Sequence, residues 1–216
     1  MESEHTMDKN QQRPEHSWQS DVIAVTGTIG SGKSTFVRLL KELGAFVVDA
    51  DQLAREVVEP GADALKEIVV NFGTEVLQED GSLDRKALGT LIFNAPEKRE
   101  ILEKVLHPKI RERAKDKFQS ALNDGHTKLI YEIPLLFETG SDKLGFKSIV
   151  TVFANDQICR ERILKRNPEL SEAQVRSRIK SQLPVEKKIA GADITIDNST
   201  TLNELQEKAQ RLIDSL

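Results

Sequence analysis

The residues best suited to chemistry form a glycine-rich stretch near the start of the chain, VIAVTGTIGSGKST over residues 22–35. It contains G-x-x-x-x-G-K-S, preceded by an apolar run and followed by a helical pattern. Glycines let successive backbone N–H groups point at phosphate oxygens, and the following helix adds the positive end of its dipole. We therefore predict that this stretch binds the phosphates of ATP. The predicted ATP-phosphate residues are Gly27, Thr28, Ile29, Gly30, Ser31, Gly32, Lys33, Ser34 and Thr35.

Two side chains of this stretch have chemistry of their own. Lys33 is expected to reach the β- and γ-phosphate oxygens and to assist catalysis, and the Ser34 hydroxyl to ligate the Mg²⁺ that accompanies ATP. The alternative is a glycine-rich turn with an unrelated lysine. The strand pattern before the motif and the helix pattern after it favour the phosphate site, so ATP and Mg²⁺ are the predicted cofactors.

A pair of carboxylates follows the second apolar run, in VVDAD over residues 47–51. Ligands of open α/β sheets bind outside the carboxyl ends of the strands, so this pair is expected to face the phosphate site. Transfer of a phosphoryl group to an alcohol needs a carboxylate that orients the hydroxyl and accepts its proton. We assign that role to Asp51. The alternative is that Asp49 or Asp51 is the N-cap of the next helix, and one residue can have both roles.

Two arginines, Arg162 and Arg166, lie four residues apart on a predicted helix and therefore share a face. In a phosphotransferase such arginines neutralise the charge on the transferring phosphoryl group and bind ATP. We count Arg166 as catalytic as well as ATP-binding. The alternative is a solvated basic helix face.

The chain has the elements needed to hold these residues at one edge of a sheet. Apolar runs predict strands at residues 22–26, 45–49, 128–133, 148–153 and 194–196. All but the last lack strict alternation, as expected of strands buried on both faces. Helical patterns alternate with them. The predicted fold is α/β, a P-loop NTPase-type open parallel five-stranded sheet with helices on both faces.

Two helical insertions interrupt this alternation. Residues 52–125 show almost only helical periodicity. This segment is far longer than the dozen or so residues that a crossover between parallel strands needs. Within it, Leu106-His107-Pro108 predicts a break between two helices. Residues 171–174 predict a helix cap in a second insertion. The predicted organisation is a disordered tail at 1–20 and one domain at 21–216, with core segments 21–58, 126–159 and 189–216, a helical insertion at about 59–125 and a lid at about 160–188.

Composition excludes several classes of protein. The 31 basic and 35 acidic side chains give a net charge of -4, so we expect no nucleic-acid partner. The single cysteine, Cys159, excludes an intramolecular disulfide. No apolar stretch approaches the roughly 20 residues that cross a bilayer, and the polar start of the chain is unlike a signal peptide, so we expect no membrane partner and a cytoplasmic protein.

The phosphate motif alone does not separate kinases from GTPases and ATPase motors. The N-K-x-D motif of GTPases is absent. ATPase motors usually carry a Walker B motif, a run of apolar residues that ends in Asp or Glu, and LIYE at residues 129–132 matches it only weakly. Glu132 is open to two interpretations, a carboxylate near magnesium or a member of a strand-end ion pair. The size of the chain and its two insertions favour a small-molecule kinase.

The chain resembles the dephospho-CoA kinase family over nearly all of residues 22–198. The motifs that carry the resemblance are VTGTIGSGKST, VVDADQLAREVVEPG, LDRKAL, LHPKI, IPLLFE, RIKSQLP and ADITIDN, in this order. The resemblance implies phosphorylation of the ribose 3′-hydroxyl of 3′-dephospho-CoA by ATP, the last step of coenzyme A biosynthesis. It also implies that Asp51 is the base, and that the insertions are a CoA-binding domain and a lid.

The resemblance suggests further site residues. Asn198 is expected near the adenine of ATP. The expected contacts of the dephospho-CoA substrate, besides Asp51, are Arg85 and His107. Pro134, Leu135, Leu136 and Glu138 follow the third predicted strand and are expected to line the substrate side of the crevice. A histidine at a helix end is alternatively a C-terminal cap.

The chain departs from the family pattern at two positions. Thr28 replaces a glycine, at a position where the phosphate motif is variable. Cys159 replaces a glutamine, and we expect it to pack as a small apolar side chain.

Two other functions are compatible with the sequence. One is another nucleoside or small-metabolite kinase, and the other is an ATP-dependent switch whose helical insertion binds a protein. A kinase releases ADP only with its acceptor, whereas a switch hydrolyses or merely binds ATP regardless of added alcohols.

Overall fold

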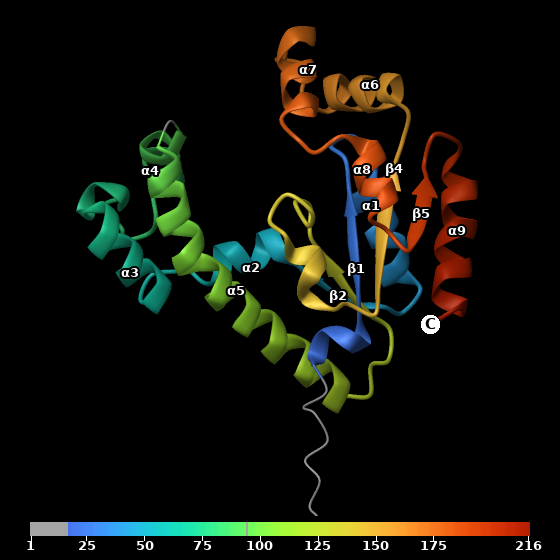
Figure 1. The fold of residues 1–216 in the computed structure, drawn as a ribbon, viewed down its shortest axis with the longest axis horizontal. Helices are drawn as coiled ribbons and strands as arrows, with labels where there is room; N and C mark the ends of the chain where they lie inside the picture. The colour runs from blue at the N-terminus through green and yellow to red at the C-terminus, as the bar shows by residue number, and fades with distance from the viewer. Residues whose placement is uncertain (1–16, 94) are drawn as a thin grey trace, which may run out of the picture.

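The fold is built on a five-stranded parallel sheet in the order β2-β3-β1-β4-β5 (Figure 1). The computed structural model describes residues 17–93 and 95–216, so most of the predicted tail lies outside the described residues. The strands are β1 Val22–Gly27, β2 Phe46–Asp49, β3 Leu129–Glu132, β4 Ser148–Phe153 and β5 Ile194–Asp197. The predicted α/β sheet is confirmed, with strand ends that differ from the predicted ones by at most one residue.

Strand β1 lies in the middle of the sheet and is buried along its whole length. Its alternate side chains enter two different apolar clusters. Ile23 and Val25 pack with helices α1 (Lys33–Glu42) and α9 (Leu202–Asp214). Val22 and Ala24 pack on the other face with helix α5 (Pro96–Asn123). Burial on both faces explains why the strand shows no polar alternation.

A helical lobe stands beside the sheet (Figure 1). It contains α3 (Asp63–Phe72), the short 3₁₀ turn η2 (Thr74–Val76), α4 (Arg85–Phe93) and the first half of α5. Its own apolar cluster includes Ile68, Leu88 and Leu102. Helix α2 (Ala50–Glu56) joins the lobe to the end of β2.

The predicted helix break at Leu106-His107-Pro108 is wrong, because α5 runs through it without interruption. Proline removes one hydrogen bond, the one to the carbonyl of Lys104 four residues earlier. Apolar contacts on both sides offset that loss: Val105 packs in the lobe cluster and Ala114 in the cluster under the sheet.

The second predicted insertion contains α6 (Asp156–Arg166), α7 (Glu172–Lys180) and α8 (Val185–Ala190). Helices α6 and α7 extend beyond one end of the sheet (Figure 1). The predicted cap at residues 171–174 is confirmed as a capping box between Ser171 and Gln174.

The prediction of a disordered tail over residues 1–20 is wrong for residues 17–20. Trp18–Asp21 forms a 3₁₀ turn, η1, and the Trp18 side chain is buried against Phe118 with ring centroids 5.4 Å apart. A segment this short has no periodicity to reveal it, yet one large aromatic ring is enough to anchor it. Among the described residues, no helix is both long and apolar enough to cross a membrane.

Candidate active site

The predicted phosphate-binding loop connects β1 to α1 and requires glycine at two positions. Gly30 and Gly32 have φ angles of 79° and 83°, a region that side chains with a Cβ rarely adopt. A Cβ on Gly30 would also lie 2.6 Å from the carbonyl oxygen of Cys159, and one on Gly32 would collide with the Asn198 amide. Because α1 begins at Lys33, its first backbone N–H groups have no partner within the helix and suit an anion.

Three side chains from the far end of the sequence hold this loop in place. Asn198 Nδ2 donates to the carbonyl oxygen of Ser31 at 2.7 Å, and Arg162 donates to the same oxygen at 3.2 Å. Arg162 also donates to the Asn198 carbonyl oxygen at 3.0 Å. On the other side of the loop, the Ile29 N–H donates to Gln182 Oε1 at 2.8 Å. The loop is therefore held in shape by the residue after β5, by α6 and by the segment after α7.

A hollow of about 640 Å³ lies over this loop. Every predicted ATP-site residue lines it except Ser31, a residue of the loop that is fully buried. Asn198 reaches the hollow but is 5% exposed, with its amide committed to Ser31. The lining residues are Gly27, Thr28, Ile29, Gly30, Gly32, Lys33, Ser34, Thr35, Asp51, Pro134, Arg162, Ile163, Arg166, Gln182, Asn198, Thr200, Leu202 and Leu205.

Glu132, the last residue of β3, forms an ion pair with the Lys33 ammonium group. Both side chains are largely covered, at 12% exposed for Lys33 and 10% for Glu132. The sequence left Glu132 open between a carboxylate near magnesium and a strand-end ion pair, and the structure contains the ion pair. The contact fixes the Lys33 side chain at the edge of the hollow over the phosphate-binding loop.

The two carboxylates after β2 have different surroundings. Asp49 is the N-cap of α2, and its Oδ1 accepts from the N–H groups of Asp51 at 2.7 Å and Gln52 at 3.3 Å. Asp51 lies in the first turn of α2, and its exposed side chain lines the hollow over the phosphate-binding loop. The capping role therefore belongs to Asp49, which leaves the Asp51 carboxylate free to meet a ligand.

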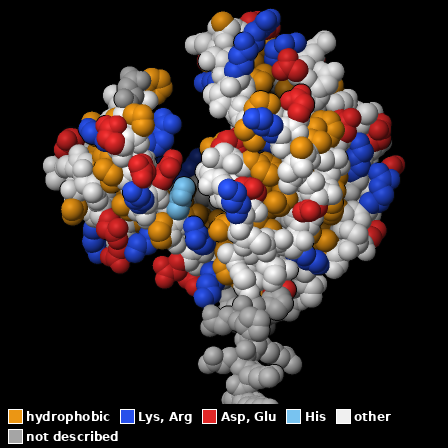
Figure 2. Space-filling model, in the orientation of Figure 1, with side chains coloured by type: hydrophobic (Ala, Val, Ile, Leu, Met, Phe, Trp, Pro, Cys, Tyr) orange, Lys and Arg blue, Asp and Glu red, His pale blue; other side chains and the backbone are white. Residues whose placement is uncertain are grey.

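A second hollow of about 220 Å³ adjoins the first, and Asp51 and Pro134 line both. Its walls are mostly apolar, with His107 and Arg111 contributed by α5. In Figure 2 the molecule is hollowed between the helical lobe and the body that carries the sheet. The lining residues are Trp18, Ala50, Asp51, Ala54, His107, Ile110, Arg111, Tyr131, Ile133, Pro134, Leu135, Thr139, Gly140, Ser141 and Leu144.

Tyr131 contributes a neutral phenol to this second hollow. Burial raises its pKa far above the ordinary value, the negative charge of Asp49 raises it further, and the positive charge of Arg111 opposes both. The phenol therefore stays protonated across the physiological range of pH.

The structure brings only some of the predicted dephospho-CoA contacts to the second hollow. His107, Pro134 and Leu135 line it. Leu136 does not, because its side chain is fully buried in the apolar cluster beside α5. Arg85 also lines neither hollow and is exposed at the start of α4.

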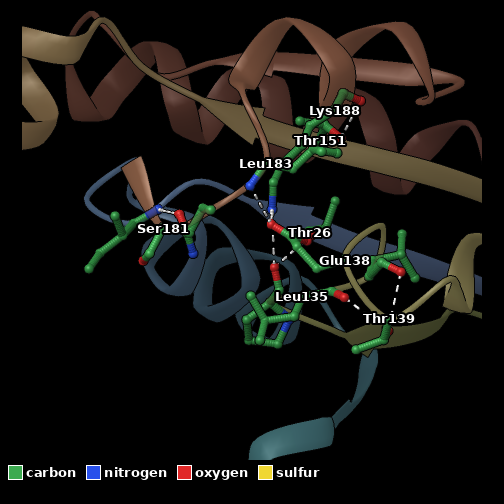
Figure 3. A network of polar contacts seen from close by, with 12 residues as sticks. Thr26, Leu135, Glu138, Thr139, Thr151, Ser181, Leu183 and Lys188 are labelled. Atoms are coloured by element: carbon green, nitrogen blue, oxygen red, sulfur yellow. Dashed lines mark hydrogen bonds and ion pairs between the residues drawn. The ribbon is translucent and has the colours of Figure 1, made fainter. Parts of the chain in front are cut away.

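Glu138 lines neither hollow because other partners take its carboxylate (Figure 3). Its Oε1 accepts from Lys188 Nζ at 2.8 Å and from the Leu183 N–H at 3.0 Å. Burial raises the pKa of Glu138, but these two hydrogen bonds and the Lys188 charge outweigh burial, and the net pKa lies below its usual value. In this structure the carboxylate that was predicted to contact the substrate forms an ion pair with Lys188.

Lys188 is fully buried and connects three parts of the molecule. Besides binding Glu138, its ammonium group donates to the Pro134 carbonyl oxygen at 3.4 Å. The same oxygen accepts from Thr26 Oγ1 at 3.1 Å. Its own carbonyl oxygen accepts from Thr151 Oγ1 at 3.1 Å. The network joins β1, β4 and the loop after β3 to α8 (Figure 3). Leu183, whose N–H donates to Glu138, directly follows the Gln182 that holds the phosphate-binding loop.

Sequence reasoning missed or undervalued several residues at the two hollows. Arg111 was not among the predicted site residues because it lies in a charged RER run, a pattern typical of a solvated surface. It nevertheless lies four residues after His107 and so shares its helix face. Gln182 was part of a family motif but had no assigned role. Trp18 carried no signal at all, because it lies in a polar segment without periodicity. Cys159, in contrast, packs as the predicted small buried side chain.

Comparison with known proteins agrees with this geometry. The family model for dephospho-CoA kinase matches residues 21–204. The chain is 44% identical over 195 residues to the dephospho-CoA kinase of Anaeromyxobacter dehalogenans, covering 90% of this chain and 92% of that protein. It is 42% identical over 192 residues to that of Bacillus cereus (strain ATCC 10987 / NRS 248), covering 89% and 95%.

Solved structures show the same likeness. A dephospho-CoA kinase from Campylobacter jejuni superimposes with a TM-score of 0.67 at 29% identity, covering 90% of this chain and 96% of that one. A protein from Thermus thermophilus gives a TM-score of 0.75 at 33% identity, covering 90% and 97%. With its phosphate-binding loop, its paired hollows and these relatives, the chain belongs to the dephospho-CoA kinase family.

Proposed function

We propose that the chain transfers the γ-phosphoryl group of ATP to the ribose 3′-hydroxyl of 3′-dephospho-CoA, giving coenzyme A and ADP. One observation carries the assignment of the two substrates to the two hollows. Asp51 lines both the hollow over the phosphate-binding loop and the apolar hollow beside it. A group that must meet the donor phosphate and the acceptor hydroxyl together belongs at such a junction.

On the donor side, the loop amides and the N-terminus of α1 bind the phosphates of ATP. Lys33, fixed beside Glu132, supplies positive charge at the β- and γ-phosphates. Arg166 lies at the edge of the same hollow with an exposed side chain, and in the described part of the chain its Nε donates to Asn167 Oδ1 at 3.3 Å. It is therefore free to neutralise charge on the transferring group. Arg162 has a supporting role, because its guanidinium holds the loop at Ser31.

The residues at the donor hollow fit a magnesium ion that enters with ATP. Mg²⁺ is commonly held by one or two protein oxygens together with substrate phosphates, and Ser34 offers such an oxygen on the hollow. The described part of the chain has no cluster of three potential metal-ligating side chains, as expected when the phosphates supply most of the ligands. The ion's chemistry there is charge neutralisation on the phosphate oxygens.

On the acceptor side, Asp51 orients the ribose 3′-hydroxyl and accepts its proton as the oxygen attacks the γ-phosphorus. The bond between the γ-phosphorus and the bridging oxygen to the β-phosphate breaks, and ADP leaves. His107 and Pro134 contribute to the walls that hold the acceptor. In this scheme the helical insertion at about 59–125 supplies part of the acceptor wall, and the segment at about 160–188 acts as the lid. We further propose that the protein works in the cytoplasm without a nucleic-acid partner.

An ADP-release assay across a panel of acceptors tests the proposal. We expect ADP release with dephospho-CoA and only background release with nucleosides, with shikimate or without acceptor. Equal release without any acceptor would indicate an ATP-hydrolysing switch. Release with a nucleoside but not with dephospho-CoA would indicate a different small-molecule kinase.

A further inference from the structure

The segment before β1 is built into the fold through Trp18. The Trp18 ring stacks on Phe118 at 5.4 Å between centroids, and lies 6.1 Å from Tyr131 and 6.3 Å from Phe146. The carbonyl oxygen of the next residue, Gln19, accepts from the Lys147 N–H at 3.1 Å. The indole therefore has a fixed orientation, set by three aromatic neighbours and a backbone hydrogen bond.

The part of Trp18 that is not covered by these neighbours faces the acceptor hollow. Trp18 as a whole residue is 8% exposed and lines that hollow together with Tyr131, Ile133 and Asp51. The family model matches the chain only from residue 21, so Trp18 precedes the matched region. This wall of the hollow is therefore an addition of this chain to the region that the family model describes.

The chemistry of the acceptor identifies the group that would meet this wall. In 3′-dephospho-CoA the purine base and the reacting hydroxyl are attached to the same ribose, whereas the pantetheine arm is separated from it by a diphosphate. When the hydroxyl lies at Asp51, the base is the nearest apolar part of the molecule. A flat base suits a hollow walled by aromatic and aliphatic side chains, because aromatic rings favour offset stacking and edge contacts.

We propose that Trp18 is a specificity-determining residue for the acceptor, whose indole forms part of the wall that the purine base of 3′-dephospho-CoA contacts. The proposal rests on the function proposed above. It assigns to the segment before β1 a direct part in acceptor binding, and it leaves ATP binding to the other hollow, which Trp18 does not line.

The chain carries its own probe for this contact, because Trp18 is its single tryptophan. Excited where adenine does not absorb, the indole emission of the full-length protein should change on titration with dephospho-CoA and saturate near the acceptor KM. The same titration with 4′-phosphopantetheine, which lacks the purine, should leave the emission unchanged. Unchanged emission at saturating dephospho-CoA would overturn the proposal. An equal response to 4′-phosphopantetheine would overturn the assignment of the wall to the purine.

Steady-state kinetics of substituted proteins give an independent readout. We expect Trp18→Leu to raise the acceptor KM about three- to tenfold while the ATP KM and kcat stay within about twofold, because a contact equal in ground and transition states changes KM alone. Trp18→Phe should restore most of the affinity. The matched control is Phe118→Leu, which weakens the same aromatic cluster at a residue that does not line the hollow. If Phe118→Leu raises the acceptor KM as much as Trp18→Leu, the effect is packing and the proposal fails.

Truncations separate the aromatic wall from the rest of the N-terminal segment. We expect removal of residues 1–16 to leave both KM values unchanged, and removal of residues 1–19 to raise the acceptor KM as Trp18→Leu does. An unchanged acceptor KM after the longer truncation would contradict the proposal. Failure of the proposed function gives a different result, which is no dephospho-CoA-dependent ADP release from the unmodified chain.

Discussion

Replacing Asp51 by asparagine tests the proposed chemistry most directly. The substitution keeps the shape of the side chain and removes the proton acceptor. Loss of a general base costs about 10²- to 10⁴-fold in rate. At about 1.4 kcal/mol per tenfold, this is about 3–5 kcal/mol of transition-state stabilisation. We expect kcat to fall in that range with little change in either KM.

The structure predicts that this loss is not a stability effect. Asp51 is exposed and the cap of α2 is Asp49, so Asp51→Asn should change the free energy of unfolding by less than about 0.5 kcal/mol. Asp49 provides the matched control. Asp49→Asn keeps an oxygen that can accept both backbone hydrogen bonds and should have a small effect, whereas Asp49→Ala should cost about 0.5–2 kcal/mol of stability.

The assay is steady-state ADP release with dephospho-CoA, accompanied by thermal melts of each variant. A shift of about 2–4 °C in Tm is expected per kcal/mol for a chain of this size, which makes the Asp49→Ala effect measurable. If Asp51→Asn keeps more than half of the wild-type kcat, the base lies elsewhere and the reasoning from the two hollows is wrong.

Three further predictions concern the donor side and its supports. Lys33→Ala should reduce ADP release to background while circular dichroism still reports a folded chain, and full retention of release would refute the phosphate site. Gln182→Ala removes the acceptor for the Ile29 N–H and should raise the ATP KM several-fold, and an ATP KM equal to that of the wild type would contradict the contact. Lys188→Met should lower stability at neutral pH by about 3 kcal/mol, and Glu138→Gln by at least as much, because each leaves one partner of a covered ion pair unpaired. Because the folded-state pKa of Glu138 lies below its ordinary value of 4.5, the pair's contribution is complete at higher pH and is lost as pH falls through that lowered pKa. Urea unfolding at a series of pH values should therefore show the gap between wild type and Lys188→Met closing under acid conditions.

Features set by short-range signals were predictable from the sequence. The phosphate-binding loop needs glycine at fixed spacing between a strand and a helix, so its position and its neighbouring elements follow from about a dozen residues. The strands were recognisable as apolar runs because both of their faces are buried. Local pattern could not decide between Asp49 and Asp51, since both fit a cap, and only the position of α2 shows that Asp49 takes it.

Features set by long-range contacts were not predictable. A lysine is usually exposed, so nothing in the sequence indicates that Lys188 is fully buried with its partner Glu138 fifty residues away. Glu138 was assigned to the substrate because it follows a strand. Its position in the sequence gives no indication of the ion pair with Lys188. The sequence predicted a helix break at Pro108 because local helix preferences take no account of the apolar packing on either side of the proline.

The continuous course of α5 has a consequence for how the molecule unfolds. The helix has 28 residues, about 42 Å at 1.5 Å per residue. Leu102 near its start is in the cluster of the lobe, and Phe118 near its end is in the cluster under the sheet. Because one helix is shared by both clusters, the lobe cannot unfold without loss of the apolar contacts that the first half of α5 makes with it. We therefore expect amide hydrogens on both sides of Pro108 to exchange through the same opening event, and lobe and sheet to unfold as one cooperative unit.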